Sequence, residues 1–240
     1  MKRFFAENAR DGIYSFSNEE SNHIIRVSRL RAGDKIIVAD GENDAIAEII
    51  SDDPTCASAK LIELIPNKAN PKRDITLYMA CSKSDKLELC AQKACELGLS
   101  SFVPFVSKRC VKVPDDKSSV KLAARLERIA FEALKQCGRN TPMHTEKPIS
   151  FKELLEKIKN TELTLFAYEA SENSLKNALD NGRNAKSIAL IVGCEGGFDE
   201  TEAAQIENAG AECVSLGSRI LRAETAAIAL SSIVSFELNN

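Results

Sequence analysis

The segments Gly193-Cys194-Glu195-Gly196-Gly197-Phe198 and Leu216-Gly217-Ser218-Arg219-Ile220-Leu221-Arg222 decide the interpretation of this chain. We call them the first loop and the second loop. Each directly follows a short apolar run and leads into a helical pattern, so they predict two loops at the ends of two neighbouring strands. Because ligands of open α/β sheets bind at the carboxyl ends of strands, we expect the function to reside here.

The chain around these loops alternates strand and helix patterns from residue 74 onward, which predicts an α/β fold with a parallel sheet. Asp199 is expected to cap a helix, with Glu202 as its reciprocal partner. The last helix is apolar nearly all round, so it should be buried in the domain or against a second subunit. The expected strands cover residues 75–81, 102–106, 163–168, 188–192 and 212–216, and the expected helices cover 84–98, 118–137, 151–158 and 223–238.

The N-terminal part has a different pattern, with short alternating stretches broken by turns. Residues 35–40 and 45–50 read as a hairpin joined by a tight turn at 40–43, and 59–65 as a further strand. Residues 18–30 are expected to form a helix capped by Asn18. This pattern predicts a small β-rich module, interpreted as a barrel, and the proline-bounded segment 66–71 reads as a linker.

Composition excludes some classes of protein and leaves others open. The 240 residues are 44% apolar, which supports a real core, and no run is long and apolar enough for a transmembrane helix. The first residues lack an apolar signal core, so we expect a cytoplasmic protein with no membrane partner. With two histidines and no C-x-x-C pair, we expect no metal and mostly buried, reduced thiols among the eight cysteines.

Charge is distributed unevenly along the chain. The net charge is −3, but residues 72–139 carry a balance of +6. A basic middle third in an acidic protein indicates a polyanion partner, although solvated helix faces would give the same pattern and are slightly favoured from charge alone.

The glycine-rich first loop does not match the known phosphate-binding patterns. No lysine follows Gly196 or Gly197 as in a P-loop, and no G-x-G-x-x-G opens a βαβ unit. The carboxylate of Glu195 would repel a phosphate, so a neutral or cationic ligand fits better, with backbone groups free to read an adenine edge. An ordinary tight turn and a plain strand–helix join are the alternative interpretations of the two loops.

At these residues the sequence resembles the bacterial 16S ribosomal RNA uracil-N3 methyltransferase family of the knotted SPOUT superfamily. Glu195-Gly196-Gly197-Phe198 matches the family's first motif, in which Cys194 replaces a proline. The second motif is matched by Leu216-Gly217, residues 219–222 and Glu224-Thr225-Ala226. Shorter blocks agree over nearly the whole chain, among them Arg3-Phe4-Phe5, residues 92–94, 96–98 and 107–109.

The resemblance implies a knotted α/β methyltransferase domain at residues 72–240 and a small PUA/OB-like β-barrel that binds RNA at residues 1–68. It also implies a homodimer with the last helix in the interface, and 16S rRNA of the small ribosomal subunit as substrate. S-adenosylmethionine (S-adenosyl-L-methionine) is the implied cofactor. The implied cofactor-binding residues are Phe166, Ala167, Gly193, Glu195, Gly196, Gly197, Leu216, Gly217, Ile220, Leu221, Arg222, Thr225 and Ala226.

Methylation of uracil N3 requires loss of a proton, and the charge left on the ring can be stabilised by an arginine. We expect Arg222 or Arg139 to do this and Glu195 to act near the cofactor or to orient its own loop; no base is evident. A SPOUT methyltransferase for another rRNA or tRNA base, and a non-catalytic RNA-binding assembly factor, are the alternatives. The expected RNA contacts are Arg3, Arg10, Arg26, Arg29, Lys83, Lys108, Arg109 and Arg139.

Overall fold

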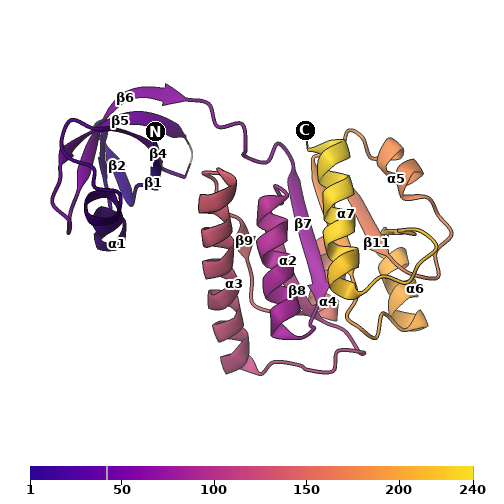
Figure 1. Cartoon of the computed structure of the whole chain (residues 1–240). Helices are drawn as coiled ribbons and strands as arrows, with labels where there is room; N and C mark the ends of the chain where they lie inside the picture. Colours follow the sequence, from indigo (N-terminus) through magenta and orange to yellow (C-terminus); the bar gives the residue numbers. More distant parts are fainter. Residues whose placement is uncertain (42, 240) are drawn as a thin grey trace. The chain divides into compact units, whose positions relative to one another are not determined.

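The computed structural model describes residues 1–41 and 43–239, which form two compact units. One unit contains Met1–Asn70 and Leu134–Pro142, and the other contains Pro71–Ala133 and Met143–Asn240. Figure 1 shows the chain coloured from its N-terminus to its C-terminus. Each unit has its own sheet.

The larger unit contains a parallel sheet with the strand order β10-β8-β7-β12-β11-β13 and β9 paired beside β8. The predicted α/β fold with a parallel sheet is therefore confirmed. One detail of the prediction is wrong: β11 lies between β12 and β13, so the strands that carry the two loops are not neighbours. The strand bounds are β7 Asp74–Ala80, β8 Ser101–Val106, β9 His144–Thr145, β10 Ile149–Ser150, β11 Leu163–Ala167, β12 Ser187–Val192 and β13 Glu212–Val214.

Helices cover both faces of this sheet, as the apolar character of β12 requires. In Figure 1, α2 and α7 lie in front of the strands, whereas α4 and α6 lie behind them. Buried residues of α4 and α6, among them Leu154 and Ile206, share one core cluster with strand residues such as Phe105 and Ile191. The helix bounds are α2 Ser84–Glu96, α3 Asp116–Cys137, α4 Phe151–Ile158, α5 Leu175–Asn181, α6 Glu200–Asn208 and α7 Ala223–Leu238.

Local signals in the sequence explain where several helices begin and end. The predicted cap of α6 is confirmed, because the Asp199 carboxylate accepts a hydrogen bond from the Glu202 N–H at 2.7 Å within a capping box. Ser150 and Glu153 form a second capping box at α4. Gly98, with a φ of +82°, follows the end of α2.

The smaller unit contains a mostly antiparallel sheet with the order β1-β4-β5-β6-β3-β2. The predicted hairpin is present as β4 and β5, although Glu42 of its turn lies outside the described residues. Phe4, Ile24 and Ile36 belong to its core. The strand bounds are β1 Arg3–Phe5, β2 Asn8–Arg10, β3 Ile13–Ser15, β4 Lys35–Ala39, β5 Asp44–Ser51 and β6 Ser58–Ile65.

The helix predicted at residues 18–30 is shorter and capped differently. Ser17, not Asn18, is the N-cap, and its hydroxyl accepts a hydrogen bond from the Glu20 N–H at 3.2 Å. The helix α1 covers Asn18–Asn22 and continues as the π-helix η1 at His23–Val27. Arg29 has a φ of +58°, a conformation that a right-handed helix cannot include, so the helix ends before it.

Residues of the interdomain segment and of the α3 C-terminal loop are held in the smaller unit by one buried carboxylate. Asp44 accepts hydrogen bonds from Arg3 at 2.6 Å, from Asn67 at 2.7 Å and from Asn140 at 3.2 Å. Arg3 and Asn67 also donate to the Gly138 carbonyl. This network explains why residues 134–142 group with the N-terminal strands, a long-range arrangement that periodicity does not reveal.

Candidate active site

The two loops line one wall each of the same cavity, which has a volume of about 740 Å³. The first loop follows β12, and the second follows β13; β11, between them, contributes the residues that come after it. Because the strands are parallel, all three segments meet at one edge of the sheet. The lining residues outside the two loops are Lys86, Ala167, Tyr168, Glu169, Ser171, Val192, Ser215, Ala223 and Ala226.

The first loop is shaped by close packing around Phe198. A Cβ atom added to Gly193 would lie 2.9 Å from the Phe198 ring, which is 2% exposed and cannot move easily. That ring stacks on Phe105 and meets the edge of Phe166 at 4.9 Å between centroids. Gly197 has a φ of +64°, which explains the second glycine of the pair.

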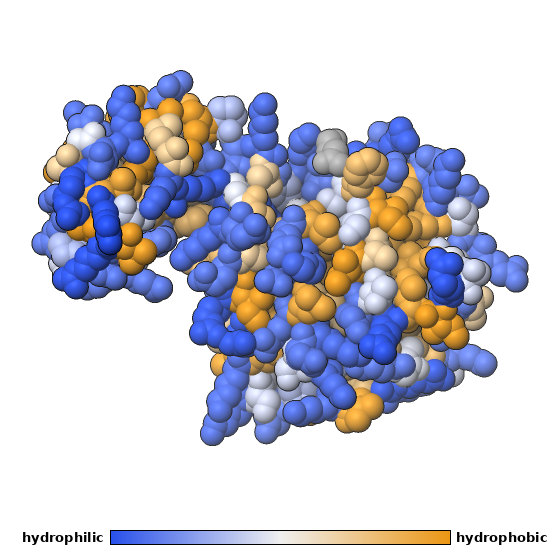
Figure 2. Space-filling model, in the orientation of Figure 1, coloured by the Kyte–Doolittle hydropathy of each residue, from blue (hydrophilic) through white to orange (hydrophobic). Residues whose placement is uncertain are grey.

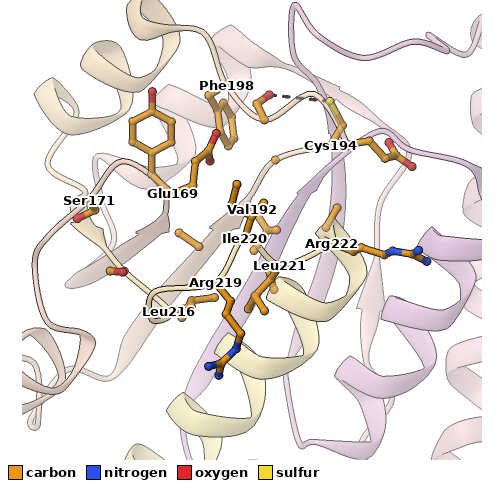
Figure 3. Close-up of a pocket in the computed structure, with 18 of the residues that line it drawn as sticks. Glu169, Ser171, Val192, Cys194, Phe198, Leu216, Arg219, Ile220, Leu221 and Arg222 are labelled. Carbon is orange, nitrogen blue, oxygen red and sulfur yellow. Dashed lines mark hydrogen bonds between the residues drawn. The ribbon is translucent and has the colours of Figure 1, made fainter.

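Cys194 and Arg109 fasten the same loop to the segment after β8. The buried Cys194 thiol donates to the Arg109 carbonyl at 3.2 Å, and the Arg109 guanidinium donates to the Gly196 carbonyl at 2.8 Å. Figure 3 shows the Cys194 sulfur turned back toward the loop's own backbone, where it lies 3.9 Å from the Gly197 carbonyl oxygen. Cys194 thus makes side-chain contacts at the position where the family that this sequence resembles has a rigid proline.

The second loop provides apolar walls and two cationic side chains. Leu216, Ile220 and Leu221 line the cavity, and Ile220 is 89% exposed. In Figure 3 the side chains of Arg219 and Arg222 extend in different directions from the loop. Arg222 is the residue immediately before α7 and lies at the rim of the cavity, where that helix begins.

One lysine connects the first loop with the start of α7. The Lys86 ammonium of α2 lies 3.0 Å from a Glu195 oxygen and 3.1 Å from a Glu224 oxygen. Close contact with the Glu195 and Glu224 carboxylates raises the pKa of Lys86, so it stays protonated at neutral pH. Partial burial acts to raise the pKa of Glu195 and of Glu224, but contact with the Lys86 ammonium and with backbone N–H groups leaves both pKa values below the ordinary range.

Most of the predicted cofactor residues line this cavity, and two do not. Phe166 and Thr225 lie outside its described lining. Phe166 is fully buried and stacks on Tyr168 at 5.4 Å between centroids, so it supports a wall from behind. Those that line the cavity are Ala167, Gly193, Glu195, Gly196, Gly197, Leu216, Gly217, Ile220, Leu221, Arg222 and Ala226.

Arg139 requires a correction. It was a candidate both for charge stabilisation and for RNA contact, but it is 1% exposed and groups with the N-terminal unit. It also lies outside the described lining of the cavity. A buried guanidinium cannot reach an RNA phosphate at the surface, so we do not retain Arg139 as an RNA contact. Its role in charge stabilisation stays a prediction.

The other expected RNA contacts differ in how available their charges are. Arg10, Arg26, Arg29 and Lys83 are exposed. Arg3 instead serves the Asp44 network with a side chain only 19% exposed, so the expectation that it grips RNA directly is not supported. Among exposed residues, Lys108 pairs with Asp199 at 2.8 Å, and Arg109 holds the first loop.

Within residues 1–41 and 43–239, no group of three or more His, Cys, Asp or Glu side chains is arranged to hold a metal ion. In the same part of the chain, no helix combines the length and the apolar character needed to cross a membrane. The buried thiols are those of Cys81, Cys90, Cys95, Cys194 and Cys213.

A cavity at the carboxyl ends of a parallel sheet, framed by two glycine loops, defines the ligand site of an α/β enzyme domain. Comparison with known proteins gives this class a more specific identity. A family model described as an RNA methyltransferase domain matches residues 68–235, and one described as an RNA methyltransferase PUA domain matches residues 16–62.

Relatives match over nearly their full length. Proteins named ribosomal RNA small subunit methyltransferase E are 34% identical in Mesomycoplasma hyopneumoniae, over 96% of this chain and 97% of the relative, and 33% identical in Bacillus subtilis, over 99% and 97%. A Neisseria gonorrhoeae protein of that name, crystallised with S-adenosyl methionine, superposes with a TM-score of 0.82 at 29% identity, over 97% of this chain and 96% of that one. The chain therefore belongs to this family of RNA methyltransferases.

Sequence reasoning missed several lining residues. Tyr168, Glu169 and Ser171 follow β11, and they enter the site only because β11 lies between β12 and β13. The strand pattern ending near residue 168 was a usable signal, since every parallel strand delivers its following residues to the same edge. Lys86 had no such signal, because it is one of several lysines on an amphipathic helix.

Proposed function

We propose that this RNA methyltransferase transfers a methyl group from S-adenosylmethionine to N3 of a specific uridine in 16S rRNA of the small ribosomal subunit. The observation that carries the proposal is the joining of both motif loops around one cavity of about 740 Å³. The relatives' name and the cofactor bound in the Neisseria structure support the substrate and the donor.

The residues of the cavity suit this cofactor in size and in chemistry. Its volume lies within the usual range for small-molecule sites, roughly 300–1,000 Å³. Glycines of both loops expose backbone groups that can hydrogen-bond an adenine, and Leu216, Ile220 and Leu221 offer apolar surface to its ring. The nearby carboxylates of Glu169 and Glu195 are compatible with a cationic sulfonium or ammonium group and would disfavour a phosphate.

S-adenosylmethionine, when bound, supplies a methyl group already activated on a sulfonium sulfur, so the protein's task is positioning. Arg222 at the cavity rim is our candidate for stabilising the negative charge that uracil carries once N3 has lost its proton. Lys86 is held protonated and Glu195 is a weakened base, so neither is assigned as the proton acceptor. We place Glu195 in a loop-orienting role, because its carboxylate contacts Lys86.

The finer features of the fold are part of the proposal. We propose that the chain is knotted near its C-terminal end and that residues 72–240, apart from the segment 134–142 that groups with the smaller unit, form the methyltransferase domain. We also propose that residues 1–68 form a PUA/OB-like β-barrel that binds RNA, and that the protein is cytoplasmic. The parallel sheet and the matched PUA region support this assignment. The target base is expected to be flipped out of folded RNA into the site.

We further propose a homodimer with α7 in its interface. One face of α7 is buried in the domain through Ala227, Leu230 and Val234. Ile233 and Phe236 are 41% and 72% exposed, and Figure 2 shows apolar surface where Figure 1 places α7. Exposed apolar side chains on a helix with an already buried face are typical of a subunit contact.

The direct test is to incubate the purified protein with methyl-labelled S-adenosylmethionine and small ribosomal subunits from cells that lack this protein, and then to map the label by mass spectrometry. We expect one labelled uridine in 16S rRNA, with the methyl group on N3. A label on another rRNA or on tRNA would replace the substrate assignment. Cofactor binding without label in any RNA would indicate a binding factor instead of an enzyme.

A further inference from the structure

We propose that Lys86 is a positioning residue, whose ammonium holds the Glu195 and Glu224 carboxylates together and so fixes the first loop against the start of α7 in the shape that binds cofactor. This inference rests on the proposed function and adds to it a residue outside both glycine motifs. It concerns three elements that are distant in sequence: α2, the first loop and α7.

The geometry of the three side chains carries the inference. The Lys86 ammonium reaches both carboxylates, at 3.0 Å and 3.1 Å, and Lys86 itself lines the cavity. The three side chains are 20%, 38% and 16% exposed, in the order Lys86, Glu195, Glu224, so solvent screens them only partly. Helices α2 and α7 also pack against each other, so the helix that carries Lys86 is held next to the helix that carries Glu224.

Because it contacts two carboxylates, Lys86 should affect the shape of the cavity more than a lysine in a single ion pair would. Glu195 and Glu224 both approach one ammonium within 3.1 Å, so the two carboxylates lie close together with the ammonium as their shared partner. Without the ammonium, two ionised carboxylates of neighbouring cavity segments would repel each other. The first loop would then move away from the start of α7, and the cavity between them would lose its shape before any cofactor arrived.

Other charged groups near this cluster do not replace the lysine. Lys83 and Arg222 act on Glu195 and Glu224 respectively, but only through longer-range charge effects. The salt bridges to the two carboxylates come from Lys86. Removing its charge while keeping its aliphatic stem is therefore the informative substitution, and Lys86→Met does this.

The test compares S-adenosylmethionine binding, by titration calorimetry, between the wild type, Lys86→Met and Lys86→Arg. We expect Lys86→Met to raise the Kd on the order of tenfold. Loss of an exposed ion pair has a small effect and loss of a buried one has a large effect, and these partly exposed side chains lie between the two cases. Lys86→Arg should restore most of the affinity. Lys93→Met is the matched control, because Lys93 is on the same helix, pairs with Glu96 at 2.8 Å and lies outside the described cavity lining.

A second substitution separates positioning from general destabilisation. If like-charge repulsion causes the loss, adding Glu195→Gln or Glu224→Gln to Lys86→Met should recover affinity, although each glutamine variant alone should weaken binding. Melting temperatures of the cofactor-free variants identify those that fail to fold. In turnover assays, KM for the cofactor should rise more than kcat falls, since the lysine is not assigned to the reacting atoms.

The inference is overturned if Lys86→Met binds the cofactor as tightly as the wild type, or if the second substitution only adds to the loss. Either result would leave the proposed function intact. Failure of the wild type to bind S-adenosylmethionine would instead overturn the proposed function itself, so the two failures are distinguishable.

Discussion

Substituting Gly193 by alanine should test whether close packing of the first loop shapes the cofactor cavity. The added Cβ would lie 2.9 Å from the Phe198 ring and 3.2 Å from the Gly197 Cα, whereas ordinary contacts begin near 3.4 Å. The loop and the ring must therefore separate by about 0.5 Å, the amount by which 2.9 Å falls short of 3.4 Å. Phe198 is packed between Phe105 and Phe166, so the loop is the part expected to move.

The magnitude follows from the general cost of overpacking. Inserting a methyl group into a well-packed site costs typically about 1–3 kcal/mol. If the loop moves, the loop conformation that binds S-adenosylmethionine becomes less stable by this free energy. The Kd for S-adenosylmethionine then rises roughly 5- to 150-fold. Titration calorimetry measures the affinity, and thermal denaturation without cofactor measures how much of the cost falls on folding.

Gly196→Ala is the graded comparison within the same loop. Its added Cβ would lie 3.1 Å from the Arg109 Cβ and 3.4 Å from the Arg109 carbonyl oxygen, a smaller overlap than the 2.9 Å contact at Gly193, so we expect a smaller loss. An unchanged Kd and melting temperature for Gly193→Ala would refute the packing argument. A larger loss for Gly196→Ala than for Gly193→Ala would refute it as well.

Four further predictions concern other parts of the molecule. Arg222→Ala should lower the methylation rate roughly a hundredfold, and a near wild-type rate would remove Arg222 from its proposed role. Phe236→Glu should convert the proposed dimer to a monomer in light scattering, and a persisting dimer would place the interface elsewhere. Alanine at both Arg26 and Arg29 should reduce the salt slope of RNA binding by about 1.5 if both contact phosphates, and an unchanged slope means that neither does. Hydrogen bonds from a lysine ammonium, a threonine hydroxyl and a backbone N–H hold the pKa of Asp199 well below its ordinary value of 3.8, so its stabilisation is present above about pH 4 and is lost as the pH falls further. Asp199→Asn should therefore lower the melting temperature at pH 7, with the gap to wild type closing below pH 4; a gap that does not depend on pH would contradict this linkage.

The sequence by itself determined much of the local structure and the main features of the site. The apolar run of β12, the Asp199 cap and the helix α7 could be predicted because each depends on residues close together in the chain. The two glycine loops were placed correctly at strand ends for the same reason. The cap of α1 was assigned to Asn18 instead of Ser17 because adjacent polar residues give nearly the same capping signal.

Only the tertiary structure decided which distant segments meet at the cavity. The insertion of β11 between β12 and β13 brought Tyr168, Glu169 and Ser171 into the lining. The packing of α2 against α7 brought Lys86 to two carboxylates, and the burial of Arg139 made its guanidinium inaccessible to an RNA phosphate at the surface. Strand order and side-chain burial depend on contacts between residues far apart in the chain, which periodicity and local spacing do not encode.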